Sequence, residues 1–75
     1  MRTREQLIEI SGRSEQELWL LAAAMLARHG DQAEETLAML ANGEIDQGNA
    51  RDAAVWLAAA SFLGDLRALQ EKHLH

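Results

Sequence analysis

Side chains that could hold a metal ion occur at two places in the sequence. Glu44, Asp46 and Asn49 carry the oxygen donors that calcium prefers, and His73 and His75 carry imidazole nitrogens two residues apart. The acidic segment lacks the spacing of an EF-hand calcium loop and the bidentate glutamate that closes one. The histidine pair has no acidic neighbour in register, which is typical of a solvated tail. We therefore expect no metal and no cofactor.

Side chains for nucleophilic or acid–base catalysis are few. The three serines are Ser11, Ser14 and Ser61, and none lies in the strand–turn–helix context of a nucleophile elbow. Glu34 and Glu35 are adjacent carboxylates, but neighbours on a helix point about 100° apart and so do not converge on one substrate. Cysteine is absent. The sequence predicts a protein that is not an enzyme.

The charge balance also excludes several partners. The net charge is -5 at pH 7 with seven Lys and Arg, and no basic cluster is available to neutralise phosphates, so we expect no direct binding of DNA or RNA. The longest apolar run, Leu18 to Ala27, is too short to cross a bilayer as a helix. The sequence therefore predicts a cytoplasmic protein that does not bind membranes.

That apolar run must belong to a helix, and the residues on either side of the run mark where the helix begins and ends. Ser14 and Glu17 have the spacing of a capping box, and Gly30 follows the last turn. Because apolar residues extend around most of its circumference, we expect this helix, at about 14–29, to be the centre of the fold. A shorter helix at about 4–10 is expected to lie across it, with Thr3 and Gln6 as a second possible capping box and Ser11-Gly12 as its stop.

The third helix is predicted at about 31–42. Asp31 is placed as its N-cap, and Asn42-Gly43 has the composition of a helix stop. The segment 44–49 is then an extended loop, with Ile45 expected as an anchor beneath the helices. The short turn at Gly30 predicts that the second and third helices form an antiparallel or sharply angled hairpin.

The last helix is predicted at about 50–72, with Asn49 as its cap. Gly64 interrupts its pattern. The alternatives are a helix that continues, with close helix approach compensating for the glycine, or a break there; we favour continuation. A seam with coiled-coil-like spacing runs along one face, formed by Val55, Ala59, Phe62, Leu66 and Leu69.

These elements predict a single all-α domain over residues 1–75, a small bundle of three main helices preceded by the short one. Four short motifs add a resemblance: Glu17-Leu18-Trp19, His29-Gly30-Asp31-Gln32-Ala33, Gly43-Glu44 and Ala54-Val55-Trp56. Over about 15–69 the chain resembles a family of small uncharacterised bacterial helical proteins. It departs from that pattern in having Gly-Glu for Gly-Asp and a longer loop over 45–51. The resemblance implies a fold and no established activity.

For function, the sequence favours a small regulatory or adaptor protein that acts through protein–protein contacts of an apolar helical face. It would work as a homodimer or bound to a larger protein. The contacts we predict are Trp19, Phe62, Leu66 and Leu69. Trp19 has a second interpretation, which we favour, in which both tryptophans stack into one core between the helices.

The alternative function is an acidic inhibitor, of phage or mobile-element type, that occupies the basic nucleic-acid-binding groove of a target protein. Its contacts would be Glu34, Glu35, Glu44 and Asp46. The two functions differ in their salt dependence, because contacts between charges weaken steeply with ionic strength and apolar contacts do not.

Overall fold

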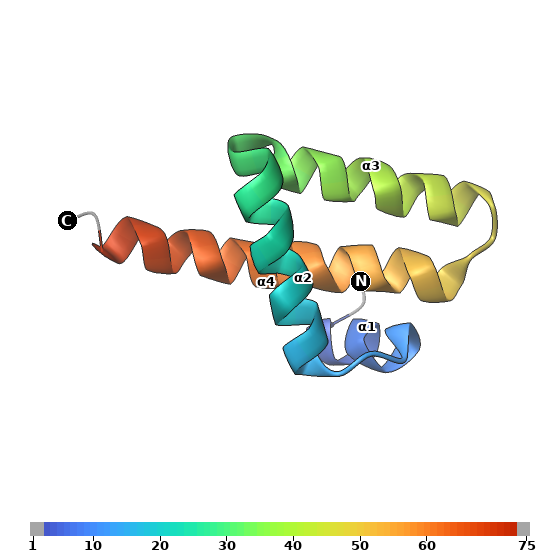
Figure 1. The fold of residues 1–75 in the computed structure, drawn as a ribbon. Coiled ribbons are helices and arrows are strands. Elements are labelled where there is room, and N and C mark those ends of the chain that lie inside the picture. Colours follow the sequence, from blue (N-terminus) through green and yellow to red (C-terminus); the bar gives the residue numbers. More distant parts are fainter. Residues whose placement is uncertain (1–2, 74–75) are drawn as a thin grey trace.

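The computed structural model describes residues 3–73, with side chains described through residue 71. The all-α prediction is confirmed, since this part of the chain contains helices and no strand (Figure 1). The elements are α1 (Arg4–Ser11), α2 (Glu15–His29), the 3-10 turn η1 (Gly30–Gln32), α3 (Ala33–Asp46) and α4 (Ala50–His73). Within residues 3–73, no helix combines the length and the apolar character that a membrane crossing requires.

The first two helices begin at the predicted caps. The Thr3 hydroxyl accepts a hydrogen bond from the Gln6 amide at 3.2 Å, and the Gln6 side chain accepts one from the Thr3 amide at 2.9 Å. This reciprocal pair satisfies two backbone donors that a helix start would otherwise leave open. The Ser14 hydroxyl likewise accepts from the Glu17 amide, at 3.1 Å. Local sequence therefore sets both starting points.

Both helices also end where the glycines predict. Gly12 follows α1 with a φ of 70°, and Gly30 follows α2 with a φ of 54°. Residues with a Cβ avoid this left-handed region, so glycine lets the chain turn at little cost. The structure thus confirms the stops at Gly12 and Gly30.

The prediction that Asp31 caps the third helix is wrong. The chain passes through η1 before α3, and the residue before α3 is Gln32, whose side chain makes no capping hydrogen bond. The Asp31 carboxylate instead accepts a hydrogen bond from the Arg67 guanidinium at 3.4 Å. Asp31 lies inside η1, so it does not occupy the position that precedes α3.

The predicted stop at Asn42-Gly43 is also wrong, because α3 continues to Asp46. Gly43 does not take a positive φ; Gly48 does, at 78°, and it lies in the turn before α4. The predicted loop 44–49 therefore shrinks to residues 47–49. Ile45 becomes a helical residue that is 55% exposed, not a buried anchor.

The predicted continuation of the last helix is confirmed, since α4 runs without a break from Ala50 to His73. Asn49 directly precedes it, and the Asn49 carbonyl accepts the Ala53 amide at 3.0 Å. The expected compensation at Gly64 is absent, because no atom lies within 4 Å of the position that a Cβ would occupy. Gly64 therefore weakens the helix without allowing a close approach.

The central element of the fold is α4, not the apolar helix α2. Three successive residues of α4, Ala53, Ala54 and Val55, are all buried. Since each is rotated by about 100° from the last, the first half of α4 is covered from several sides. On α2 only the stripe of Leu18, Ala22 and Met25 is buried. The prediction was wrong because the apolar run of α2 is wider than the surface that the other helices cover.

The other helices are arranged around α4. Figure 1 shows α3 antiparallel to α4, α2 crossing both at a steep angle, and α1 beside the first half of α4. The sharply angled packing of α2 and α3 is confirmed. The short helix α1, in contrast, packs extensively on α4 rather than across α2. The end of α4 extends beyond the others, and the molecule is 42 Å long and 22 Å wide.

Arg4 fastens α1 to α4. Its guanidinium forms an ion pair with Asp65 at 2.8 Å and donates a hydrogen bond to the Ser61 hydroxyl at 2.8 Å. The same group lies over the Phe62 ring, 4.5 Å from the ring centroid, in a cation–π contact. The sequence does not predict this role of Arg4 in packing, because the residues that Arg4 contacts are remote in the chain.

Candidate functional site

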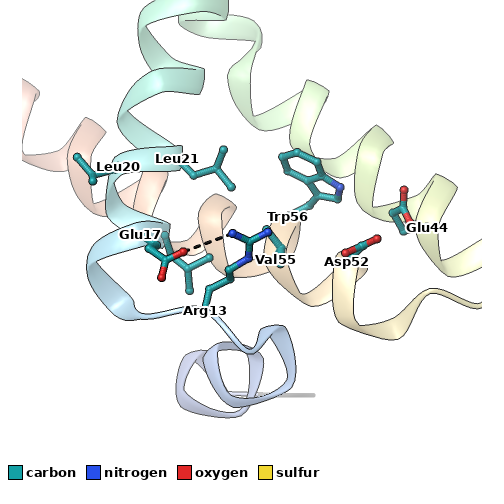
Figure 2. Close-up of a pocket in the computed structure, with 9 residues that line it drawn as sticks. Arg13, Glu17, Leu20, Leu21, Glu44, Asp52, Val55 and Trp56 are labelled. Atoms are coloured by element: carbon teal, nitrogen blue, oxygen red, sulfur yellow. Dashed lines mark hydrogen bonds and ion pairs between the residues drawn. The ribbon is translucent and has the colours of Figure 1, made fainter.

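The described surface contains an open groove of about 600 Å³, which we call the Trp56 groove. It lies between α2, the end of α3 and the beginning of α4 (Figure 2). Its size is within the range of small-ligand and peptide-anchoring sites. The lining residues are Arg13, Glu17, Leu18, Leu20, Leu21, Glu44, Asp52, Val55 and Trp56.

The groove follows from the topology. The helices α2 and α3 join at η1 and diverge from it, since α2 crosses α4 whereas α3 runs along it (Figure 1). The contact between α2 and α3 is correspondingly slight compared with the contact of either helix with α4. The wedge between the start of α2 and the end of α3 is therefore left open, and α4 forms its floor.

Apolar side chains form one side and the floor of the groove. Leu20 is 64% exposed, and Leu21 and Trp56 are half-buried. In Figure 2, Trp56 projects from α4 into the space between α2 and α3, and Leu21 faces it from α2. Leu20 lies on the side of α2 away from Trp56, so it forms the outer edge of the groove. An accessible indole beside apolar side chains is an arrangement that protein-binding surfaces favour.

The rim of the groove is charged. The Arg13 guanidinium lies 3.4 Å from the Glu17 carboxylate, and this hydrogen bond, aided by one from the Ser14 backbone, lowers the pKa of Glu17 below its ordinary value. Glu44 accepts a hydrogen bond from the Asn49 amide group at 2.9 Å. With Asp52, the rim carries three carboxylates and one guanidinium. Its net charge is therefore negative.

Two of the predicted apolar contact residues lie together, but inside the fold. The ring centroids of Trp19 and Phe62 are 4.6 Å apart, with the ring planes tilted by 40°. Phe62 is completely buried, and Trp19 is half-buried against the core. Phe62 therefore offers no surface to a partner of the folded chain. The two tryptophans both pack against the core, but the ring partner of Trp19 is Phe62 and not Trp56.

The other two predicted contacts lie further along α4. Leu66 is half-buried against the core, and Leu69 is 51% exposed on the segment of α4 that extends beyond the other helices (Figure 1). The predicted seam is thus an internal packing surface as far as Phe62 and reaches the surface only at its end. The structure does not gather Trp19, Leu66 and Leu69 around a hollow of their own.

The acidic residues of the alternative function form two separate pairs. Glu34 and Glu35 lie in the first turn of α3, and Glu44 and Asp46 lie in its last turn. Ten residues of helix separate the pairs by roughly 15 Å. Glu34 is also 3.4 Å from the Arg67 guanidinium, which offsets its charge. These carboxylates therefore do not form one continuous acidic surface.

Sequence reasoning missed the groove because its walls come from three helices. One signal was available: Asp52 and Trp56 are four residues apart, which places an acid and an indole on the same face of a helix. The exposure of Leu20 had no such signal, since it depends on how far apart α2 and α3 lie. Among the side chains described, those of residues 3–71, no three His, Asp or Glu side chains gather around a point that could hold a metal. The side chains of His73 and His75 lie outside the described part.

The chain matches no protein-family model, and neither a curated protein nor a solved structure matches it significantly. The resemblance to small bacterial helical proteins therefore stays a prediction. The function of the Trp56 groove has to be inferred from the positions, exposure and charge of its own residues.

Proposed function

We propose that this protein is a small non-enzymatic regulatory or adaptor protein that binds a partner protein through the Trp56 groove. The observation that carries the proposal is the apolar wall beside the half-buried Trp56, formed by the half-buried Leu21 with the exposed Leu20 at its outer edge. Burying such surface is the main source of affinity in protein–protein contacts.

The groove is a better contact surface than the predicted set on the other side of α2. Phe62 is buried, and Trp19 is half-covered by packing against it. A partner could not reach Phe62 without displacing core residues. At the groove, the apolar surface of Leu21 and Trp56 is accessible in the folded chain.

The charged groups of the groove suit binding better than catalysis. Arg13 holds Glu17 in its ionised form by lowering its pKa, so Glu17 is poorly suited to donate a proton near neutral pH. The neighbouring apolar side chains contribute no reactive atoms. We therefore assign the groove a binding role.

The test is a selection of binding peptides from a random displayed library, followed by measurement of their affinities for two matched variants. Leu20→Gln changes a leucine that is 64% exposed inside the groove, and Met39→Gln changes a methionine that is 68% exposed on α3, outside the residues that line the groove. Glutamine favours helix and adds no charge. Leu20→Gln should cost about 1–2 kcal/mol of binding free energy, roughly a fivefold to thirtyfold loss of affinity.

Met39→Gln should leave the affinity unchanged. Equal losses in the two variants, or no loss in either, would place the binding surface elsewhere and contradict the proposal. Circular dichroism of both variants checks that α2 and α3 remain folded, which the exposure of both side chains favours.

We further propose that the partner is a different protein rather than a second copy. The seam on α4 is covered internally at Val55, Ala59 and Phe62, so it leaves little apolar surface for a dimer. Light scattering should give the mass of one chain, 8.3 kDa, over a range of protein concentrations. A dimer that Leu69→Gln dissociates would instead support the exposed end of α4 as a homodimer contact.

A further inference from the structure

We propose that the occupant of the Trp56 groove is a basic amphipathic helix of the partner. Its apolar side chains would pack on Leu20, Leu21 and Trp56, and a lysine or arginine would lie between Glu44 and Asp52. This inference rests on the proposed function, because it specifies the chemistry of the partner for the same groove. The distribution of charge around the groove supports the choice of a basic partner.

The groove has an apolar side and an acidic side. The apolar side comes from α2, with Leu20 and Leu21. The acidic side comes from the end of α3 and the first turn of α4, which contribute Glu44 and Asp52. Figure 2 shows both carboxylates on the side of the groove away from Leu20. A ligand that fills the groove must therefore present apolar and polar groups on opposite sides.

The charges on the rim are not balanced. Arg13 is engaged by Glu17 at 3.4 Å, so the positive charge of the rim is already compensated by one carboxylate. Glu44 and Asp52 have no ion-pair partner within the described part of the chain. A cation from the partner would supply the missing charge, whereas an acidic partner would be repelled.

Trp56 strengthens the preference for a cation. It lies one turn after Asp52 on the same face of α4, so a side chain that pairs with the carboxylate passes beside the indole. Tryptophan is the best of the aromatic side chains at binding Lys or Arg through its ring face. The indole can therefore contact both the apolar part and the charged part of the ligand.

A second copy of this chain fits the groove poorly. The net charge of the protein is -5 at pH 7, so two copies repel one another in addition to the local repulsion at the rim. A helix is the occupant that suits a groove between helices, because its side chains alternate between an apolar and a charged face.

The position of Asp52 has one other explanation, namely that its charge stabilises the N-terminus of α4. That explanation does not extend to Glu44, which lies in the last turn of α3, where a negative charge is unfavourable for the helix dipole. Glu44 accepts a hydrogen bond from the Asn49 side chain at 2.9 Å, which orients its carboxylate but leaves the negative charge uncompensated.

The experiment uses three synthetic amphipathic helical peptides with leucine on one face and lysine, glutamine or glutamate on the other. Isothermal titration calorimetry with the full chain gives each affinity. Tryptophan fluorescence in a Trp19→Phe background, which leaves Trp56 as the only indole, reports whether the peptide reaches the groove. We expect the lysine peptide to bind at least about tenfold more tightly than the glutamine peptide and to shift the Trp56 emission. The glutamate peptide should not bind.

Two variants with the same change in net charge provide the control. Glu44→Gln with Asp52→Asn removes the rim carboxylates, and Glu35→Gln with Asp46→Asn removes two exposed carboxylates of α3 that do not line the groove. The first pair should abolish the preference for lysine over glutamine, and the second should retain it. Loss of the preference in both would mean that the peptide responds only to overall charge, which overturns the inference.

The remaining outcomes separate this inference from the proposed function. Equal affinity for the lysine and glutamine peptides, with a shift of the Trp56 emission, would overturn the cation preference and leave the groove as a protein-binding site. Binding that leaves the Trp56 emission unchanged and tolerates Leu20→Gln would overturn both. If none of the three peptides binds, the inference is overturned, and the library selection decides the proposed function by itself.

Discussion

The two sides of α2 differ in how completely the other helices cover them, although a half-buried tryptophan lies on each side. On one side, Trp19 packs on Phe62, whose ring is also covered by the Arg4 guanidinium. On the other side, Trp56 lines an open groove with the exposed Leu20. Leu21 is two residues after Trp19 and is therefore rotated from it by about 200° around the axis of α2. Different neighbours consequently cover the two sides.

This contrast shows that tertiary neighbours, more than residue type, decide which apolar side chains remain available for binding. Arg4 reaches across from α1 and closes the side that contains Trp19 and Phe62. The side that contains Trp56 stays open because α2 and α3 diverge there (Figure 1). Substitutions on the two sides of α2 test that difference, and a change in α4 provides a more stable background for them; the largest expected effect comes first.

Phe62→Ala should cost about 3–5 kcal/mol of unfolding free energy, because it leaves a cavity in the buried core. Trp56→Ala should cost less than half as much, since its side chain is half-buried and faces a groove. Urea denaturation of both variants measures the difference. Equal costs would show that the Trp56 side is as well packed as the Trp19 side and would remove the contrast.

Arg4→Met should cost about 1–2 kcal/mol, because it removes the ion pair with Asp65 and the cation–π contact with Phe62. Arg13→Met, which breaks an exposed pair with Glu17 at the groove, should have a much smaller effect on stability, because solvent screens the pair. A double-mutant cycle with Asp65→Asn isolates the Arg4 pair. A coupling energy near zero would mean that Arg4 does not hold the closed side together.

Gly64→Ala should stabilise the protein by about 0.5–1 kcal/mol, since Gly64 lies inside α4 with no atom near the added methyl group. This variant touches neither side of α2, so it provides a more stable background in which strongly destabilised variants can be compared. Gly48→Ala is the opposite control and should destabilise by about 1 kcal/mol, because its φ is 78°. Thermal unfolding of both variants shows whether each substitution raises or lowers the stability.

The smallest effect concerns Glu17. Its pKa should lie below the ordinary value for glutamate because Arg13 and the Ser14 backbone stabilise the carboxylate. A folded-state pKa that is lowered makes a stabilising contribution above the unfolded-state pKa, and this contribution is lost as the pH falls through the folded-state pKa. An NMR titration of the Glu17 side chain should show the lowered value. Arg13→Met should return it toward the ordinary range, and an unchanged titration would refute the pairing in solution.

Prediction from the sequence succeeded where a feature depends on residues close together in the chain. The caps at Thr3 and Ser14 and the stops at Gly12 and Gly30 each involve groups within one helical turn. It failed at Gly43, because α3 continues to Asp46 and the glycine with a positive φ is Gly48. A glycine permits a helix to stop but does not impose the stop.

The candidate site was less predictable than the fold. Of the predicted apolar contacts, Phe62 is a core residue, and none of the four lines the Trp56 groove. Glu44 was named in the sequence analysis, but as part of an acidic surface rather than as one edge of an apolar groove. The groove depends on the angle between α2 and α3, which no spacing in the sequence encodes.

The sequence by itself determined that this chain is helical and where its first two helices start and stop. These follow from hydrogen bonds and backbone preferences that act within a few residues. Only the tertiary structure decided that α4 is the centre, that Arg4 covers Phe62, and that Leu20 and Trp56 are left accessible. The physical reason is that burial depends on which surfaces the other helices cover, and those helices are brought together by contacts between residues far apart in the chain.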